Sequence, residues 1–378
     1  MPVTERVAIF LSFSGDGGVE HMMVNLAAAM ARQGVAVDLV RARAEGGHVA
    51  SLPDGVRVVD LGARHSWSSV WPLARYLRRE RPAALLAAKD RANRAAIRAA
   101  RLARVDTRIA VRLGNNLSQA LHGRSALRRW LRTRPMRRAY RRADAVIAVS
   151  HGVAEDTAAV TGLPLKSIQV LPNPVVTPQL AERAAGAPDH PWLREPGNAP
   201  LILAVGRLNR QKDFPTLLRA FARLREDRAA RLIILGEGPR RAELAALIRD
   251  LGLAEAVSLP GFAANPYPAM ARADLFVLSS AWEGSPNALT EALALGTPVV
   301  ATDCPSGPRE ILADGRYGPL VPVGDDAALA DAMARTLAEP PARAHLQAAA
   351  ERYRDTASAR AYLEVLGITP PHPQQRPA

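Results

Sequence analysis

The amino-acid sequence predicts an α/β protein of two domains, each with a parallel sheet covered by helices on both faces. Three observations support this prediction. The chain has 378 residues, which is more than one typical domain needs. Short apolar strands alternate with helical segments in both halves of the chain, as in parallel sheets. Between the halves, residues 183–199 are rich in proline and glycine and lack apolar periodicity, which indicates a linker.

The expected elements follow from short apolar runs and helical spacing. In the first half, strands are expected at 5–13, 35–40, 56–61, 83–87, 108–111 and 145–149, and helices at 19–32, 68–79, 90–103 and 124–142. In the second half, strands are expected at 201–205, 231–235, 257–259, 275–278 and 299–301, and helices at 214–225, 243–251, 267–272, 326–338 and 341–365. We therefore predict domains over 1–180 and 199–340, a linker over 181–198, a C-terminal helix over 341–366 and a disordered tail over 367–378.

Positive charge is concentrated in the first half. The formal net charge is +14, and residues 72–142 hold 20 arginines and one lysine against Glu80, Asp90 and Asp106. Such asymmetry usually means an anionic partner. A single cysteine, Cys304, excludes an internal disulfide and favours a reducing, cytoplasmic location. No run of 18 apolar residues is present, so no membrane-spanning segment is expected.

Residues 282–303 are expected to form a loop, a helix, a turn and a buried strand. Ser285 is placed to cap the helix and is followed by proline at the first helical position. Asn287 and Glu291 share a face, and Glu283 lies just before the helix. A polar helix start can hold an anion, and two acids could grip hydroxyl groups on either side of its phosphates. A surface helix with solvated acids would show the same spacing.

Two glycine-rich loops, 15–18 and 236–241, are expected between a strand and a helix, where phosphates often bind. The dinucleotide fingerprint needs a third glycine where this chain has Glu20 and Arg241. Neither loop ends in the Lys-Ser/Thr pair of a P-loop. Nicotinamide cofactors and ATP are therefore disfavoured as ligands.

A third loop, 206–213, follows a strand and carries Arg207 and Lys212. These side chains could converge on a diphosphate, the arginine as a fork and the lysine as a point charge. Lys212 is notable because the chain has only three lysines. An ordinary charged loop is the alternative interpretation.

Several segments, in order, resemble the family-4 (GT4-type) retaining glycosyltransferases: GRLNRQKDF, LIILGEGPRR, VSLPGF, ADLFVLSSAWEGSPNALTEALALGTPVVATDCPSGPREIL and GRYGPLVPVGD. The segments GGVEHMMVNLAAAMARQG and DAVIAVSHGV are similar to the family's first domain, so the resemblance covers most of residues 5–325. It implies the GT-B fold, in which two Rossmann-like domains have parallel sheets facing a central cleft. The N-terminal domain would bind the acceptor and the C-terminal domain the nucleotide sugar. The helix over 341–366 would cross back to the N-terminal domain.

The resemblance also implies roles for individual residues. Glu283 and Glu291 match the family's pair of glutamates, of which the first faces the donor sugar and the second accepts from the ribose hydroxyls. Arg207 and Lys212 match the pair that neutralises the donor diphosphate. The other matched positions surround the donor: Gly17 and Gly18 at the phosphate and acceptor, Asn287, Ala288 and Leu289 with backbone N–H groups at the helix start, and Gly261 and Phe262 beside the base.

One part of the first domain departs from the family's pattern. Many members carry a histidine after a first-domain strand, near the reacting sugar, whereas the matching residues here, 112–116, contain none. Asn115 is therefore a candidate catalytic residue, and Arg112 or His122 could take the role instead. Asn173 matches the end of the family's first domain.

These residues predict transfer of a hexosyl group, with retention, from a UDP- or GDP-sugar to a saccharide or lipid-linked acceptor, in cell-surface polysaccharide or glycolipid synthesis. Fixed cations and N–H groups can stabilise the departing nucleoside diphosphate, so neither a metal nor a cofactor is expected. A nucleotide-sugar epimerase or a phosphorylase are alternatives within the fold. A nucleic-acid-binding protein is the non-enzyme alternative, which the lack of stacking aromatics in the basic stretch disfavours.

The arginine-rich segment 124–142 allows two interpretations. Its arginines surround Trp130, Leu131 and Met136, and a basic helix with interspersed apolar groups suits an anionic membrane surface. The protein would then lie peripherally on the inner face of the cell membrane, with no nucleic acid as partner. The alternative is a solvated arginine-rich face.

Overall fold

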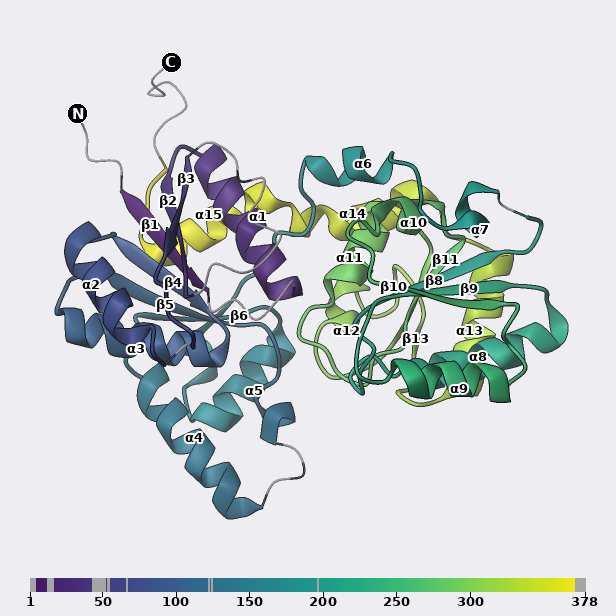
Figure 1. Cartoon of the computed structure of the whole chain (residues 1–378), viewed down its shortest axis with the longest axis horizontal. Coiled ribbons are helices and arrows are strands. Elements are labelled where there is room, and N and C mark those ends of the chain that lie inside the picture. The colour runs from purple at the N-terminus through teal and green to yellow at the C-terminus, as the bar shows by residue number, and fades with distance from the viewer. Residues whose placement is uncertain are drawn as a thin grey trace. The chain divides into compact units, whose positions relative to one another are not determined.

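The computed structural model describes residues 5–11, 17–42, 52, 55–65, 67–121, 123, 125–195 and 197–370 (Figure 1). The chain divides into two compact units. Unit 1 comprises Met1–Val175 and Arg354–Ala378, and unit 2 comprises Val176–Tyr353. Each unit is built on one parallel β-sheet, which confirms the predicted α/β class with two Rossmann-like domains.

The sheet of unit 1 has seven parallel strands in the order β3-β2-β1-β4-β5-β6-β7. They are β1 (Arg6–Leu11), β2 (Ala36–Arg41), β3 (Val56–Asp60), β4 (Ala84–Ala88), β5 (Arg108–Leu113), β6 (Ala145–Ala148) and β7 (Ile168–Val170). The helices are α1 (Gly18–Arg32), α2 (Val70–Glu80), α3 (Asp90–Ala103), α4 (Ala126–Tyr140), α5 (His151–Thr161) and α15 (Asp355–Leu366). In Figure 1, α1 and α15 lie side by side on one face of the sheet, and α2 and α3 cover the other.

The sheet of unit 2 has six parallel strands in the order β10-β9-β8-β11-β12-β13. They are β8 (Leu201–Val205), β9 (Arg231–Leu235), β10 (Val257–Gly261), β11 (Leu275–Leu278), β12 (Val299–Thr302) and β13 (Leu320–Val321). The helices are α6 (Gln179–Ala184), α7 (Pro191–Arg194), α8 (Phe214–Asp227), α9 (Arg241–Asp250), α10 (Tyr267–Arg272), α11 (Asn287–Ala294), α12 (Pro308–Ile311), α13 (Asp326–Ala338) and α14 (Arg343–Ala350). Among the described helices of both units, none is long and apolar enough to cross a membrane.

The central strands are buried on both faces, which explains their unbroken apolar sequences. Residues 7–10 of β1 and 202–204 of β8 have no exposed surface. Strands of this kind read as continuous apolar runs and not as alternating ones. For the same reason the expected strands are all observed, and β8, β9 and β11 have the predicted bounds. The short edge strands β7 and β13 were not expected.

Two boundaries differ from the prediction. The segment 181–198, expected as a linker, contains the end of α6 and all of α7, and both belong to unit 2. The helix expected over 341–366 is interrupted: Glu351–Tyr353 form a 3-10 turn, Arg354 is extended, and the Tyr353 carbonyl accepts from the Val176 N–H at 3.0 Å. The first part, α14, therefore packs on α11 in unit 2, and α15 packs on α1 in unit 1. Residues 371–378 of the expected tail lie outside the described residues.

Candidate active site

In unit 2, the chain changes direction across the sheet between β8 and β11. Strands β9 and β10 lie on one side of this pair, and β12 and β13 lie on the other. In open parallel sheets, ligands bind outside the carboxyl ends of the strands at such a switch point. The loops that leave β8 and β11 there carry Lys212 and Glu283, both of which the sequence analysis predicts to be binding-site residues.

Lys212 and Glu283 form an ion pair at this switch point. Lys212 Nζ lies 2.6 Å from Glu283 Oε1, and the two side chains are 17% and 7% exposed. Glu283 also accepts hydrogen bonds from Ser280 Oγ at 2.6 Å and from Gln211 Nε2 at 3.2 Å. Three donors therefore hold one carboxylate, so its position does not depend on the lysine alone.

The backbone around Lys212 is fixed from both sides. Its N–H donates to Asn209 Oδ1 at 3.2 Å, and its carbonyl accepts from Ser279 Oγ at 2.8 Å. Gly206 leaves space for the lysine stem, because a Cβ at this position would lie 2.9 Å from Lys212 Cε. The loop therefore presents the ammonium group in one place.

The glycine-rich loop after β9 packs against the loop after β8. A Cβ at Gly236 would collide with the carbonyl oxygen of Gly206, so glycine is required for this approach. The Leu208 N–H donates to the Glu237 carbonyl at 2.9 Å, and the Gly236 N–H donates to that of Gly261 at 2.8 Å. In this loop, glycine permits close backbone packing between the loops that follow β8, β9 and β10.

Glu291 lies on α11 and is buried. Tyr267 Oη donates to its Oε1 at 3.2 Å, and the Arg183 guanidinium lies 4.7 Å from the centre of the Tyr267 ring. Burial raises the pKa of Glu291 from 4.5 to about 7, although the Tyr267 hydrogen bond and the positive charge of Arg183 oppose this. The carboxyl group is therefore poised to change charge near neutral pH.

The start of α11 differs from the expected cap. The helix begins at Asn287 with Pro286 as its N-cap residue, so Ser285 lies one position before the cap. The Leu289 N–H, expected to be available to a ligand, donates to the Pro286 carbonyl at 3.1 Å. The first turn is tightened by this bond, and the half-buried Asn287 and Ala288 lie beside it.

Arg207 and Phe262 are exposed residues on two neighbouring loops of unit 2. Arg207 follows β8, and Phe262, which is 61% exposed, follows Gly261 at the end of β10. Phe262 is one of the few large apolar side chains that this unit presents to solvent. Exposed aromatic rings of this kind can stack on a nucleotide base.

In unit 1, the corresponding switch point lies between β1 and β4. Gly17 and Gly18 begin α1 after β1, while residues 12–16 lie outside the described part of the chain. Lys89, which follows β4, forms an ion pair with Glu20, whose side chain is 1% exposed. The other carboxylate oxygen of Glu20 is buried and has no hydrogen-bond partner among the described residues.

Arg112 and Asn115 have different environments. Arg112 is 1% exposed, donates from Nε to Tyr362 Oη at 3.0 Å, and contacts Asn173 Oδ1 through Nη2. This arginine therefore joins β5 to α15 and to the end of the first segment of unit 1. Asn115 is exposed in the loop after β5, and His122 lies outside the described residues.

Four residues at the candidate site were missed by sequence reasoning: Ser280, Gln211, Tyr267 and Arg183. Two of them lie close in sequence to predicted residues: Gln211 is adjacent to Lys212, and Ser280 lies three residues before Glu283 in the same loop. Tyr267 and Arg183 come from segments that are brought together with Glu291 only on folding. Their positions near Glu291 depend on tertiary structure and not on a local motif.

Known protein families match both units. The family model described as "Glycosyl transferases group 1" matches residues 188–353, and that described as "Glycosyltransferase Family 4" matches residues 16–179. A Campylobacter jejuni relative named "N-acetylgalactosamine-N,N'-diacetylbacillosaminyl-diphospho-undecaprenol 4-alpha-N-acetylgalactosaminyltransferase" is 38% identical over 50% of this chain and 49% of its own length. The "Lipopolysaccharide core biosynthesis glycosyltransferase LpsE" of Rhizobium meliloti is 28% identical over 95% of this chain and 98% of its own.

Solved structures agree with these matches at the level of the fold. The structure of Anabaena Alr3699/HepE in complex with UDP and glucose covers 96% of this chain and 99% of its own, with a TM-score of 0.76 and 20% identity. The lipopolysaccharide outer core galactosyltransferase WaaB in its apo form has the same coverage, with a TM-score of 0.71 and 20% identity. With both units matched by family models and the whole chain matched in fold, this protein belongs to the GT4-type glycosyltransferases of GT-B fold.

Proposed function

We propose that the protein transfers a hexosyl group, with retention, from a nucleotide-diphosphate sugar to a saccharide or lipid-linked acceptor. The observation that carries this proposal is the ion pair of Lys212 with Glu283 at the switch point of unit 2, where Ser280 and Gln211 also hold the carboxylate. A cation and an anchored carboxylate side by side suit a ligand that joins a diphosphate to a polyhydroxylated ring.

The proposed chemistry follows from these charges. The bond between the anomeric carbon and the β-phosphate oxygen breaks, and negative charge develops on the departing nucleoside diphosphate. Lys212 and Arg207 stabilise that charge without metal or cofactor, because preorganised cations need little reorganisation during the reaction. The acceptor hydroxyl oxygen forms the new bond to the anomeric carbon with net retention, and its proton passes to the departing nucleoside diphosphate. Glu283 orients the sugar through its hydroxyl groups.

The remaining unit 2 residues fit the nucleoside part of such a donor. The Glu291 carboxylate would accept from the ribose hydroxyls, and the Phe262 ring would stack on the base. We propose UDP or GDP as the nucleotide. The solved HepE structure, which contains UDP and glucose, supports this class of donor.

We propose that unit 1 selects the acceptor, with Asn115 and the Gly17–Gly18 helix start near the reacting groups. The Campylobacter relative is named for a diphospho-undecaprenol acceptor, and the Rhizobium relative is named for lipopolysaccharide core biosynthesis. Both names support a saccharide acceptor that is carried on, or destined for, a lipid.

A donor screen tests this proposal. We expect UDP- or GDP-sugars to raise the melting temperature of the wild-type protein, because a ligand that binds only the folded state stabilises it. The Glu283→Gln variant should bind the nucleotide yet transfer little sugar. Proton NMR of the product should show the anomeric configuration of the donor. An inverted product would refute retention, and conversion of the donor sugar without an acceptor would indicate an epimerase.

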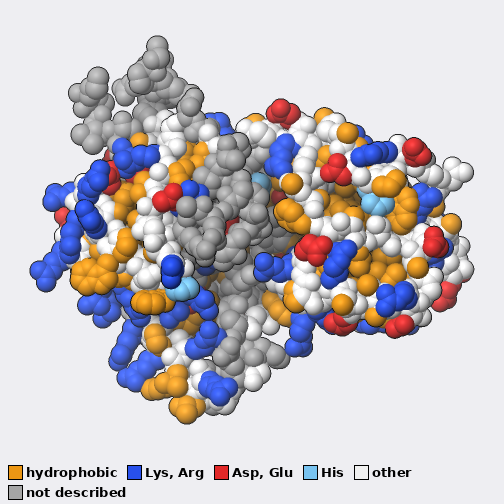
Figure 2. Space-filling view, in the orientation of Figure 1, with side chains coloured by type: hydrophobic (Ala, Val, Ile, Leu, Met, Phe, Trp, Pro, Cys, Tyr) orange, Lys and Arg blue, Asp and Glu red, His pale blue; other side chains and the backbone are white. Residues whose placement is uncertain are grey.

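We also propose that the arginine-rich segment 124–142 contacts an anionic membrane surface from the cytoplasmic side. Figure 2 shows Lys and Arg side chains gathered over unit 1, with apolar side chains among them. Leu127, Trp130 and Leu131 are 66%, 50% and 56% exposed on α4. Binding should be stronger to vesicles containing phosphatidylglycerol than to neutral vesicles and should weaken with salt. Equal binding to both vesicle types would contradict this proposal.

A further inference from the structure

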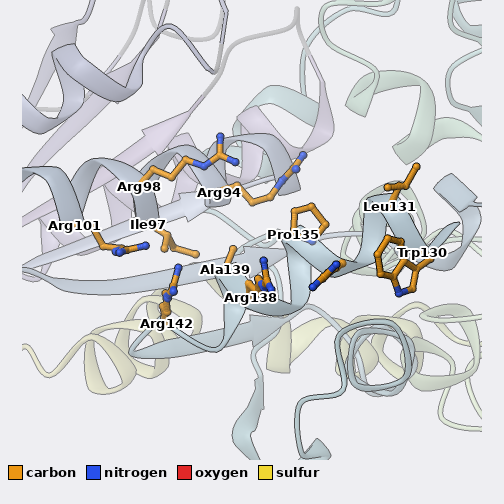
Figure 3. A pocket seen from close by; sticks show the side chains of 11 residues that line it. Arg94, Ile97, Arg98, Arg101, Trp130, Leu131, Pro135, Arg138, Ala139 and Arg142 are labelled. Atoms are coloured by element: carbon orange, nitrogen blue, oxygen red, sulfur yellow. The ribbon is translucent and has the colours of Figure 1, made fainter. Parts of the chain in front are cut away.

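A pocket of about 350 Å³ lies between α3 and α4 in unit 1. Its charged lining consists of six arginines from the two helices and the residues just after α4: Arg94, Arg98, Arg101, Arg134, Arg138 and Arg142. Figure 3 shows Arg101, Arg138 and Arg142 around the small apolar side chains of Ile97 and Ala139. The pocket therefore has a basic wall and an apolar floor.

The charge of this pocket is largely unneutralised. The sequence of α4 contains no Asp or Glu. At the start of α3, Asp90 is already engaged by Arg94 at 2.9 Å and by Tyr140 Oη at 2.8 Å. In the described part of the chain, no carboxylate pairs with the other five pocket arginines.

Gathering these arginines opposes folding. Arg134 and Arg138 lie four residues apart on α4, where like charges repel, and Arg142 follows just after the helix. Helix α4 has little burial to offset this repulsion, since its buried apolar side chains are Met136 and Tyr140. An anion in the pocket would relieve the repulsion, and guanidinium groups bind phosphate oxygens through two parallel hydrogen bonds.

The rim of the pocket adds exposed apolar surface. Trp130 and Leu131 line its outer end and are about half exposed, and the Arg134 guanidinium lies 4.8 Å from the centre of the Trp130 ring. A free inorganic anion would use only the arginines. A ligand with an anionic head and an apolar chain would use both parts of the lining.

We propose that this pocket binds a diphosphate group carried on an apolar chain. The phosphate oxygens contact Arg101, Arg138 and Arg142, and the chain packs on Trp130 and Leu131. The inference rests on the proposed function in one respect: a lipid-linked acceptor is a molecule of this chemistry. Binding at this pocket is otherwise independent of the donor site in unit 2.

Calorimetric titration tests the proposal with two probes, inorganic pyrophosphate and decyl diphosphate. The titrations use the full chain with Arg207→Ala and Lys212→Ala, so that neither probe is held by those cations in unit 2. The pocket variant adds Arg101→Ser, Arg138→Ser and Arg142→Ser. Its control adds Arg75→Ser, Arg91→Ser and Arg104→Ser, which remove the same charge from exposed positions that do not line the pocket.

We expect the pocket variant to bind both probes at least about tenfold more weakly, while the control changes affinity by no more than about threefold. A Trp130→Ser, Leu131→Ser variant should weaken decyl diphosphate and leave pyrophosphate unchanged. Equal losses in the pocket variant and the control would overturn the proposal in favour of a diffuse basic surface. Equal affinity of the wild-type pocket for both probes would overturn the apolar part.

Two further measurements distinguish binding at this pocket from donor binding in unit 2 and from nucleic-acid binding. Thermal shift with UDP-sugars, in the chain that keeps Arg207 and Lys212, reports on the donor site and is expected to be the same in the pocket variant. If UDP-sugars fail to bind but decyl diphosphate binds the pocket, the proposed donor fails and the pocket stands. Displacement of decyl diphosphate by single-stranded DNA at lower concentration would overturn the inference in favour of nucleic acid.

Discussion

Each unit has a lysine–glutamate ion pair beside the switch point of its sheet. In unit 1, Lys89 pairs with Glu20 beside the switch point between β1 and β4. In unit 2, Lys212 pairs with Glu283 beside the switch point between β8 and β11. The pairs differ in what else holds the carboxylate. Glu283 has two further donors, whereas the part of unit 1 that the structure describes provides none to the second, buried oxygen of Glu20.

This difference separates a structural pair from one suited to binding. Lys89 is the side-chain donor that the described structure provides for Glu20, so the pair holds α1 against β4. Glu283 would keep its hydrogen bonds from Ser280 and Gln211 if Lys212 turned towards a ligand, so this lysine is suited to exchanging partners. A buried carboxylate that has other hydrogen-bond donors stays partly compensated when its cation binds a ligand. A buried carboxylate without other donors would lose its compensation.

The largest expected effect is that of Lys212→Met on transfer. The change keeps the apolar stem and removes the charge that we propose faces the donor diphosphate. We expect kcat/KM to fall on the order of 10³-fold, comparable to the loss of a main transition-state donor. Stability should change less than in the matched Lys89→Met variant. Transfer within about threefold of the wild type would refute the role of Lys212.

Lys89→Met is the matched test in unit 1. It leaves the buried Glu20 without its cation, and we expect the free energy of unfolding to fall by about 3 kcal/mol. Urea denaturation would measure this loss. The folded fraction should retain kcat within about threefold of the wild type. A variant of normal stability and low kcat would instead place Lys89 in the reaction and remove the contrast between the units.

The pH dependence of Glu291 sharpens the description of unit 2. Because its folded pKa is raised from 4.5 to about 7, its contribution to stability is full below pH 4.5 and is lost as the pH rises through about 7. Compared with Glu291→Gln, the wild type should lose up to about 3 kcal/mol between these values. Urea denaturation of both proteins at pH 5 and pH 8 would measure this. An equal change in the free energy of unfolding of both proteins between pH 5 and pH 8 would contradict the raised pKa.

Phe262→Ala should have the smallest effect, and it should change only the affinity for the nucleotide. Its ring is 61% exposed, so the melting temperature of the free protein should stay nearly constant. If the ring stacks on the base, nucleotide affinity should fall about fivefold, or about 1 kcal/mol. Calorimetry with UDP and with GDP would show the loss for whichever base binds. A fall in melting temperature with unchanged affinity would show a packing role instead.

The fold was largely predictable because both sheets are buried. Apolar runs such as 201–205, which are too short for a typical helix, favour a strand that is covered on both faces, and the helix that follows this strand is amphipathic. The candidate site in unit 2 was predictable in part, since Glu283 and Lys212 lie in loops that directly follow strands. Their meeting at 2.6 Å depends on strand order, which the sequence pattern does not encode locally.

Other features were not predictable because they depend on packing between segments that are distant in the sequence. The interruption at Tyr353 places a buried ring between two helical segments, and no proline or glycine marks it in the sequence. Arg112 was a candidate for a reacting position, but it is buried against Tyr362, about 250 residues away along the chain. The raised pKa of Glu291 comes from desolvation, which depends on packing and not on neighbours in sequence.

The return of α15 to unit 1 has a consequence for the order of events during synthesis. Unit 2 is one continuous segment, so all of it is available once residue 353 has been made. Unit 1 must wait for α15, whose Tyr362 Oη accepts a hydrogen bond from Nε of the buried Arg112. While unit 2 is translated, β5 therefore holds an arginine that lacks one of its partners. The half of the protein that is made first on the ribosome is finished last, which makes it the half exposed longest to chaperones and proteases.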